Sequence, residues 1–426
     1  MEIVVVLVVF AFFLLIGIPL AFSMGMASVV GILLQGKAPL IVLAQKAFSG
    51  NDSFLFLCIP MFILAGMLMD EAGISRALVK LAESLVGFLR GGLAMVVILS
   101  EMLFSGVSGA VTADTAAIGS LLIPPMVEAG YGRERATAIL SAACGMGILV
   151  PPCLQMVIYG GLTGVSIAAL FMAGFLPAAV MALALMIQVY IQARRLNLPT
   201  MGRPSLRLVG RSMVKSTPAA IMALIIFGGI LGGIFTPTEA AVVAVIYGFL
   251  VGALIYRQIS RENALQMIIS TAKITGTIMF LCVSASLFAW FLTTERVPQA
   301  IAEFLLLLPG GKYVFLLAVN LIFLVIGSVL EGIPALIMML PLLLPAAEKL
   351  GVDPLHLGVI MIANLGVGFF LPPTGLGLYV ACTVGGTTID RVTRPLMPYL
   401  IVMFAVVLLI SYVPWISLWL PRMLGY

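Results

Sequence analysis

Charged residues are scarce in this chain. Only 9% of its 426 residues are Asp, Glu, Lys or Arg, whereas 62% are hydrophobic and the mean hydropathy is +1.24. A soluble domain carries about 25% charged residues, because its surface must be solvated. This composition excludes a soluble enzyme or a nucleic-acid-binding module, and the net charge of +5 is better explained by cytoplasmic loops. We therefore expect an all-α polytopic membrane protein.

Histidine and cysteine are also rare. His356 is the single histidine, so neither a histidine metal cluster nor the usual zinc site of an intramembrane protease can form. No Gly-x-Gly-Asp sequence is present for an intramembrane aspartyl protease. The cysteines lie in apolar segments without metal-ligand spacing and are interpreted as reduced packing residues. They are Cys58, Cys144, Cys153, Cys282 and Cys382. An intramembrane enzyme is thus disfavoured.

Two apolar stretches, 142–164 and 364–386, are each interrupted by a pair of prolines. Proline removes a backbone donor and clashes with the preceding turn, so a helix entering either stretch must unwind. Unwound backbone survives in a membrane only where protein or a water-filled cavity satisfies its polar groups. Two broken helices in corresponding positions indicate the central site of a transporter.

The two stretches belong to an internal duplication. A shift of 221 residues places Pro151-Pro152 on Pro372-Pro373. The same shift aligns other glycines and prolines with their second-half counterparts: Gly106, Pro124, Gly130, Gly145, Gly147, Gly164 and Pro177 fall on Gly327, Pro345, Gly351, Gly366, Gly368, Gly385 and Pro398. These matching prolines and glycines indicate two repeats of roughly two hundred residues.

Each repeat is predicted to contain five membrane spans and one re-entrant hairpin. The first repeat is 1–192, a basic cytoplasmic loop covers 193–215, and the second repeat is 216–426. A span needs about 20 apolar residues. The expected spans are about 3–25, 28–48, 53–69, 136–161 and 166–192, then 217–235, 238–256, 272–292, 355–382 and 395–420. The apolar start of the chain has Glu2 in place of a basic region, so it is interpreted as a retained span, not a cleaved signal.

The hairpins are expected at 93–126 and 313–346, with breaks at 105–110 and 327–332. Their arms of about 15 residues look short for full spans. An amphipathic segment precedes each hairpin, at 70–92 and 294–309. The apolar face of the first comprises Ile74, Ala77, Leu78, Leu81, Leu85 and Phe88.

An odd number of spans per repeat makes the two repeats inverted relative to each other. Placing both termini outside puts 16 of the 22 basic residues on the cytoplasmic side. This asymmetry favours periplasmic N- and C-termini in a bacterial or archaeal inner membrane. One hairpin then enters from the cytoplasm and the other from the periplasm.

The hairpin tips and helix breaks carry the candidate site residues. Small oxygen ligands and unwound carbonyls suit a hard cation such as sodium. The candidate sodium-binding residues are Ser105, Gly106, Ser108, Gly147, Gly327, Ser328, Glu331, Asn364, Gly368 and Thr374. Exposed helix N-termini favour an anionic substrate. The candidate substrate-binding residues are Thr112, Asp114, Thr115, Pro152 and Pro373.

Two further acids have structural interpretations. Glu101 could stand at the base of the first hairpin, although carboxylates inside a membrane are commonly functional. Glu239 follows Thr236-Pro-Thr and is expected to complement the N-terminal dipole of a helix.

Several motifs resemble those of one transporter family. They are Ile148-Leu-Val-Pro-Pro152, Val157-Ile-Tyr-Gly160, Gly233-Ile-Phe-Thr-Pro-Thr-Glu-Ala-Ala241, Asn364-Leu-Gly366 and Pro372-Pro-Thr-Gly375. They are similar to the large membrane subunit of tripartite ATP-independent periplasmic (TRAP) transporters. The resemblance implies an elevator-type, sodium-driven importer of organic acids. It also implies a periplasmic substrate-binding protein and a separate small four-helix membrane subunit.

Two positions depart from that family's pattern. Cys153 stands where a hydroxyl residue often follows the first proline pair, and Leu371 stands where a threonine commonly precedes the second. The number of sodium sites is therefore open, as is the acid carried: a C4-dicarboxylate, a sugar acid such as sialic acid, or a keto acid. The alternative function is a divalent-anion/sodium symporter that needs no binding protein; a channel is disfavoured by the duplicated hairpins.

Overall fold

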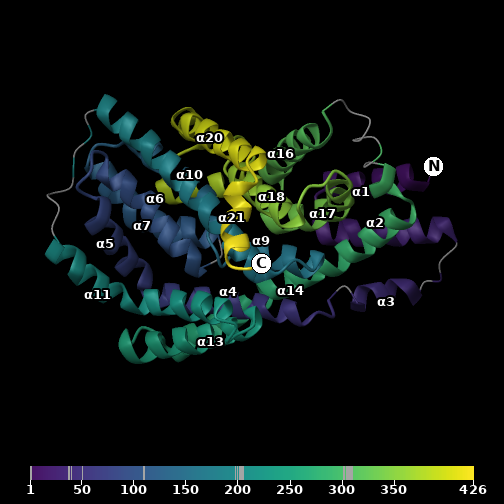
Figure 1. Ribbon diagram of the computed structural model, residues 1–426, viewed down its shortest axis with the longest axis horizontal. Helices are drawn as coiled ribbons and strands as arrows, with labels where there is room; N and C mark the ends of the chain where they lie inside the picture. Colours follow the sequence, from purple (N-terminus) through teal and green to yellow (C-terminus); the bar gives the residue numbers. More distant parts are fainter. Residues whose placement is uncertain are drawn as a thin grey trace.

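The computed structural model describes residues 2–36, 39, 41–49, 51–108, 111–196, 198, 200, 206–300, 303 and 310–426. Within these ranges every regular element is a helix (Figure 1). Eight helical segments of the described chain are long and apolar enough to cross a membrane. The expected all-α polytopic membrane protein is therefore confirmed.

One group of helices is formed by the segments that precede each hairpin. In the first half these are α1 (Glu2–Leu15), α2 (Leu20–Gln35), α3 (Ile41–Ser49), the 3-10 turn η1 (Phe54–Leu57), α4 (Cys58–Glu71) and α5 (Ile74–Val86). In the second half they are α11 (Leu206–Ala223), η2 (Leu224–Gly228), α12 (Gly229–Leu231), α13 (Pro237–Leu250), η3 (Val251–Ile255) and α14 (Arg261–Thr294). The long helix α14 packs on α2, α3 and α4, while α13 packs on α4 and α11 on α5. We call these elements the outer group.

The hairpins and broken helices form a second group, here called the hairpin group. Its first half comprises α6 (Gly92–Ser108), α7 (Val111–Glu128), α8 (Arg133–Gly147), α9 (Leu154–Thr163) and α10 (Ile167–Arg195). Its second half comprises α16 (Gly311–Val329), α17 (Gly332–Lys349), α18 (Pro354–Phe369), α19 (Leu376–Gly385), α20 (Ile389–Tyr412) and α21 (Trp415–Met423). The halves interlock, because α7 packs on α19, α17 on α9, and α8 on both α18 and α20.

The order of helices in the hairpin group repeats. Helix α7 begins at Val111 and α17 at Gly332, which is 221 residues later. Helix α8 packs on α6 as α18 packs on α16, and the pairs α7–α8 and α17–α18 also correspond. The two sequence repeats, recognised from their prolines and glycines, thus correspond to the same order of helices.

The first two predicted spans, 3–25 and 28–48, are wrong in their boundaries. Helix α1 ends at Leu15, α2 runs only from Leu20 to Gln35, and α3 is a separate helix of 9 residues. Gly17 has a φ of 84°, which L-residues with a side chain rarely adopt, and Pro19 has no N–H to continue the first helix. Gly36 ends α2 in the left-handed conformation.

The hairpin arms are longer than predicted. Helices α6, α7, α16 and α17 have 17, 18, 19 and 18 residues. At about 1.5 Å per residue such arms approach the roughly 30 Å thickness of the hydrocarbon layer. Arm length alone therefore does not make either hairpin re-entrant, and re-entrance stays a prediction. Residues 109–110, which belong to the first predicted break, lie outside the described residues.

Three other boundaries were misplaced because helices run into segments that looked like loops. Helix α10 extends to Arg195 and α11 starts at Leu206, so both enter the predicted 193–215 loop. Helix α14 has 34 residues and begins at Arg261, whereas we expected 272. The last expected span differs for another reason, because it is interrupted at Val413 and Pro414 and forms two helices, α20 and α21.

Helix α5 is amphipathic, as predicted. Leu78 is buried while Arg76 and Lys80 are exposed. The buried face packs on α6 and α11, although Leu85, expected on that face, is 39% exposed. Partial burial raises the pKa of Glu83, and the Lys80 charge lowers it in part. Half of the second amphipathic segment, residues 301–302 and 304–309, lies outside the described residues.

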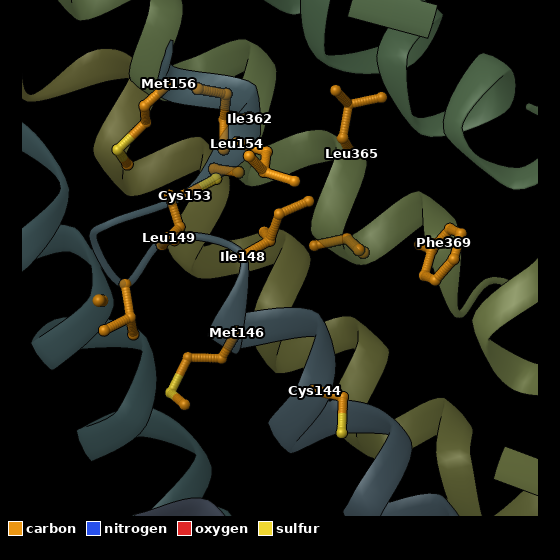
Figure 2. Packing of buried hydrophobic residues seen from close by; sticks show 14 of the residues in the cluster. Cys144, Met146, Ile148, Leu149, Cys153, Leu154, Met156, Ile362, Leu365 and Phe369 are labelled. Atoms are coloured by element: carbon orange, nitrogen blue, oxygen red, sulfur yellow. The ribbon is translucent and has the colours of Figure 1, made fainter. Parts of the chain in front are cut away.

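Both broken helices are present. Helix α8 stops at Gly147 and α9 resumes at Leu154, while α18 stops at Phe369 and α19 resumes at Leu376. The peptide bond within each proline pair is cis. Buried apolar side chains from the two breaks belong to the same hydrophobic core. Figure 2 shows Ile148 before the first break and Leu154 after it, with Leu365 of α18 nearby.

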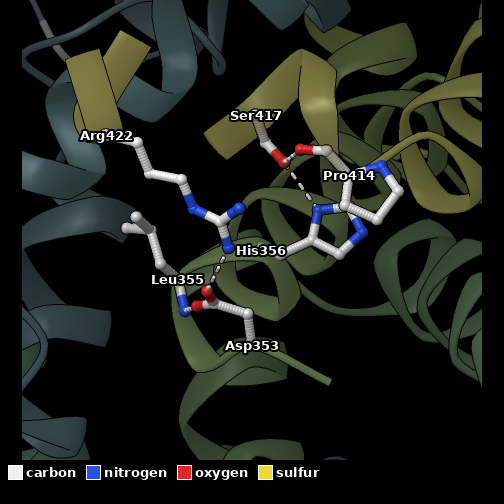
Figure 3. Close-up of polar contacts among 6 residues, drawn as sticks. All are labelled: Asp353, Leu355, His356, Pro414, Ser417 and Arg422. Carbon is white, nitrogen blue, oxygen red and sulfur yellow. Dashed lines mark hydrogen bonds and ion pairs between the residues drawn. The ribbon is translucent and has the colours of Figure 1, made fainter. Parts of the chain in front are cut away.

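A polar network fixes the start of α18 against the end of the chain. His356 contacts the Ser417 hydroxyl through Nδ1 at 2.6 Å (Figure 3). Its Nε2 lies 3.1 Å from the Ser411 carbonyl oxygen. Asp353 caps α18 by accepting the Leu355 N–H at 2.9 Å. The ion pair between Asp353 and Arg422 is largely exposed and adds little stability. The single histidine is thus a packed structural residue.

Candidate functional site

A cavity of about 310 Å³ lies between the outer group and the hairpin group. From the outer group, α14 contributes Thr277 and three apolar residues, and the hairpin group supplies the rest of the lining. This volume suits a small organic molecule. A larger cavity of about 610 Å³ between α5, α6, α10 and α11 is lined almost entirely by apolar side chains, so it offers few groups for a polar ligand.

The N-termini of three helices open onto the smaller cavity. They are represented by Val111 and Thr112 of α7, Leu154 and Gln155 of α9, and Gly332 of α17. Each N-terminus exposes unpaired N–H groups and carries about half a positive charge from the helix dipole. Since α17 comes from the second half and α7 and α9 from the first, the positive ends converge only in the folded protein. A carboxylate is the ligand that such ends favour.

The polar side chains of this cavity are Thr112, Gln155, Thr277 and Glu331. Its described lining contains no Lys, Arg or His. Of these residues, Thr112 was predicted to bind substrate and Glu331 to bind sodium. Because no basic side chain is within this described lining, the helix N-termini are the positive groups that it offers to an anion.

Gln155 is a cavity residue that the sequence analysis missed. Its Oε1 accepts the thiol hydrogen of Cys153 at 2.8 Å, which orients the amide. A Cβ added at Gly332 would lie 3.4 Å from Nε2, so the amide donor faces the tip of the second hairpin. Cys153 stands where the family often has a hydroxyl residue, and its thiol still donates a hydrogen bond that orients Gln155. In the sequence, Gln155 could have been selected as a polar residue in the first turn of the helix after a proline pair.

A buried polar cluster lies where the first hairpin meets the first break. The Ser105 hydroxyl donates to the Gly147 carbonyl at 2.8 Å. Glu101 and Asp114 are completely buried and close enough to interact electrostatically, and Cys144 lies beside Glu101. Ser105 and Gly147 were predicted as sodium ligands, and the structure brings them together. Glu101 joins them, although we had expected a hairpin-base role for it.

The second hairpin approaches the second break through glycines. A Cβ on Gly368 would lie 2.9 Å from the Leu324 carbonyl oxygen and 3.0 Å from the Gly327 backbone. Asn364 is completely buried, and its Nδ2 donates to Asn320 Oδ1 at 2.7 Å and to the Ile360 carbonyl at 2.9 Å. Its Oδ1 has no hydrogen-bond partner among the described residues. Gly327 and Gly368 are therefore in contact, and Asn364 lies one turn before Gly368 on the same helix α18.

The remaining predicted site residues are placed apart from the cavity lining. Ser328 donates to the Val325 carbonyl of its own helix at 2.7 Å. Thr115 likewise bonds the Val111 carbonyl at 2.7 Å. Pro152 is buried within the first break, while Pro373 and Thr374 are exposed in the second.

Two members of the predicted sodium set lie at the tip of the first hairpin. Gly106 and Ser108 are in the last turns of α6. The structure describes the backbone of Gly106 and Ser108 but not their burial or side chains.

The structural interpretation of Glu239 is confirmed. Its Oε2 accepts the Thr236 N–H at 2.8 Å, and the Glu239 N–H donates to the Thr236 hydroxyl at 3.3 Å. This reciprocal pair is a capping box at the start of α13. All five cysteines are free and buried, as expected.

Fold and cavity together define a membrane transporter with two broken helices facing a central site. Residues 7–416 match the model of the family described as the tripartite ATP-independent periplasmic transporter, DctM component. The chain belongs to this family and is its large permease component, so it is a transport protein and not an enzyme. The resemblance seen in the sequence motifs is thereby confirmed.

Named relatives cover nearly the whole chain. The C4-dicarboxylate TRAP transporter large permease protein DctM of Pseudomonas aeruginosa is 38% identical over 95% of this chain and 94% of its own. The sialic acid TRAP transporter large permease protein SiaM of Vibrio cholerae is 34% identical over 96% of each. The isethionate TRAP transporter permease protein DctMQ of Oleidesulfovibrio alaskensis is 38% identical over 95% of this chain but only 64% of its own length.

Solved structures share the fold at low sequence identity. The Alcanivorax borkumensis YdaH transporter has a TM-score of 0.61 and 16% identity, covering 93% of this chain and 90% of its own. Neisseria gonorrhoeae MtrF has a TM-score of 0.62 and 15% identity, covering 88% of this chain and 83% of its own. Both are membrane transporters, and at this identity the likeness concerns the fold alone.

Proposed function

We propose that this chain imports an organic acid, driven by sodium, across the inner membrane by an elevator motion of the hairpin group. The observation that carries the proposal is the cavity at the boundary between the two helix groups, onto which three helix N-termini open. Such ends bind the carboxylate of an organic acid without a basic side chain. Relatives named for a C4-dicarboxylate and for sialic acid support an acid substrate.

The elevator motion is supported by the position of the cavity, which has walls from both the hairpin group and the outer group. Most of its lining moves with the hairpins and broken helices, while α14 contributes the opposite wall. Sliding the hairpin group past α14 would carry the bound acid from one side of the membrane to the other. A cavity enclosed within one group would give no such exposure. Periplasmic positions for both termini, and hairpins that enter from opposite sides, are part of the same proposal.

Sodium coupling is supported by the oxygen atoms at the two breaks. Ser105 and Glu101 approach Gly147 in the first half. In the second half, Gly327 contacts Gly368, and Asn364 of the same helix as Gly368 has a buried Oδ1 with no hydrogen-bond partner among the described residues. Hydroxyl, amide and carboxylate oxygens are suitable ligands for a hard cation. These residues fit a sodium ion that enters with the substrate and offsets its charge.

Two partner proteins complete the proposed system. DctMQ of Oleidesulfovibrio alaskensis matches this chain over only 64% of its own length. We infer that this permease works with a small four-helix membrane subunit, as the resemblance to the family implies. A periplasmic binding protein would deliver substrate, because a partner that binds the outward-open state better shifts the equilibrium toward it.

Reconstitution with components omitted one at a time tests the proposal. Proteoliposomes should take up substrate only with this chain, the small subunit, loaded binding protein and an inward sodium gradient together. The control imposes a proton gradient without sodium. Uptake of free substrate by this chain alone would rule out the tripartite arrangement and favour the symporter alternative. Equal uptake with protons alone would rule out sodium coupling.

A further inference from the structure

Glu101 is a completely buried carboxyl group on α6. Neither of its oxygens has a partner at hydrogen-bond geometry among the described residues, and the weak thiol donor of Cys144 is the polar group beside it. The ion pair found in the described part of the chain, Asp353 with Arg422, involves other residues, so no basic side chain balances Glu101 there. Burying an ionised, unpaired carboxylate is costly. The ionised form of Glu101 therefore requires a compensating cation at this position.

The carboxylate is directed at the end of a helix where negative charge is unfavourable. Oε1 of Glu101 lies 2.7 Å from the point where a Cβ on Gly147 would sit, and Gly147 is the last residue of α8. A helix C-terminus carries about half a negative charge. The Gly147 carbonyl is itself an acceptor, and the Ser105 hydroxyl and the Val150 N–H donate to it and not to Glu101. A carboxylate and a helix C-terminus in contact both favour a cation.

Ser105 provides a second oxygen at the same place. Its Oγ lies 3.0 Å from the same hypothetical Cβ position, and residues four apart on a helix share a face. Because Gly147 has no side chain, Glu101 and Ser105 can both reach the α8 backbone. Asp114 adds a further buried carboxyl group nearby, which increases the negative potential.

We propose that Glu101 is the anionic ligand of a sodium site at the first hairpin, which it shares with Ser105. The inference rests on the proposed sodium coupling and adds a charged ligand to it. The corresponding residue 221 positions later is Ile322, so the second half lacks this carboxylate. The two halves therefore bind cations with different chemistry: a carboxylate and a hydroxyl in the first, and the Asn364 amide in the second.

Sodium binding to the purified full-length chain in lipid nanodiscs tests this assignment. The measurements are binding of ²²Na⁺ and the melting temperature in sodium chloride, with choline chloride replacing sodium at constant ionic strength. Glu101→Gln keeps the size of the side chain and removes its charge. We expect its sodium half-saturation to rise by about tenfold or more, since tenfold corresponds to about 1.4 kcal/mol. In sodium-free buffer it should melt no lower than the wild type, because an unpaired charge has gone.

Glu128→Gln is the matched control, because Glu128 is an exposed acid at the end of α7 in the same hairpin. It should bind sodium as the wild type does. If Glu101→Gln fails to fold, Glu101→Asp decides, since it keeps the charge but withdraws the oxygens. It should still be stabilised by sodium, at a higher half-saturation.

Unchanged sodium affinity in Glu101→Gln, or in Glu101→Asp if only that variant folds, would overturn the inference. Glu101 would then be a protonated structural residue, and sodium coupling would remain intact. A wild type that binds no sodium would instead overturn sodium coupling itself, together with the inference that depends on it. The two failures are thus separated by the wild-type measurement.

Discussion

Gly145 and Gly366 touch each other through their backbones where α8 crosses α18. The two residues are 221 positions apart and therefore occupy the same place in each repeat. A Cβ on Gly366 would lie 2.2 Å from the Gly145 carbonyl oxygen, and one on Gly145 would lie 2.8 Å from the Gly366 carbonyl oxygen. Contact between equivalent residues is expected where a two-fold axis relates two repeats. The broken helices are thus held together at the centre of the hairpin group.

Gly366→Ala is predicted to destabilise this crossing strongly. The added methyl group meets backbone, which cannot rotate away, so the helices must separate. We expect a loss of about 2 kcal/mol or more, in the range of overpacked cores. The measurement is the melting temperature of the purified protein. Gly276→Ala on α14 is the control, because nothing lies within 4 Å of its hypothetical Cβ and alanine favours a helix. Equal melting temperatures for both variants would contradict the contact.

Gln155→Leu is predicted to weaken substrate binding. The change removes an amide donor at the cavity while keeping a similar volume. A hydrogen bond to a charged group contributes about 1.5–3 kcal/mol, so the KM for uptake should rise by roughly tenfold or more. Gln266→Leu, at an exposed position of α14, should leave the KM unchanged. Similar KM values for both variants would remove Gln155 from the substrate site.

Asn364→Ala should raise the sodium concentration required for half-maximal uptake. It removes the buried Oδ1 that has no partner in the described structure. It also breaks the hydrogen bond to Asn320, so stability must be controlled. Asn320→Ala breaks that same bond while leaving Asn364 in place. We expect Asn320→Ala to lower the melting temperature but to shift sodium dependence much less. Equal shifts in both variants would indicate a purely structural role for Asn364.

Membrane orientation can be tested by cysteine labelling. The five native thiols are buried, so background reaction with a membrane-impermeant maleimide should be low. Arg207→Cys should label only from the cytoplasm and Lys312→Cys only from the periplasm. A membrane-permeant reagent, which should label both, controls for reactivity. Labelling of both cysteines from one side would refute the inverted arrangement of the repeats.

Local signals sufficed for the class of fold and for the helix breaks. The apolar composition and the two proline pairs predicted a polytopic membrane protein with breaks near Pro151 and Pro372, and both breaks are present. Boundaries were less predictable. A continuous apolar run does not reveal that Gly17 takes a positive φ and ends the first helix, and polar or basic residues did not stop α10, α11 or α14.

In the candidate site too, some residues could be selected from the sequence, whereas their contacts could not. Proline, glycine and hydroxyl residues act through their own backbone, so Ser105, Gly147, Gly327 and Gly368 could be selected from sequence. Their pairing across hairpins and breaks depends on helix packing. Gln155 of α9 and Thr277 of α14 line the same cavity only because the two helix groups pack against each other, and their spacing along the chain does not predict this contact.

The sequence by itself determined the membrane class, the duplication and the family, because these depend on composition and on the positions of prolines and glycines. Only the tertiary structure decided that Glu101 faces a helix C-terminus without a partner and that three helix N-termini share one cavity, because charge balance is set by distances between helices.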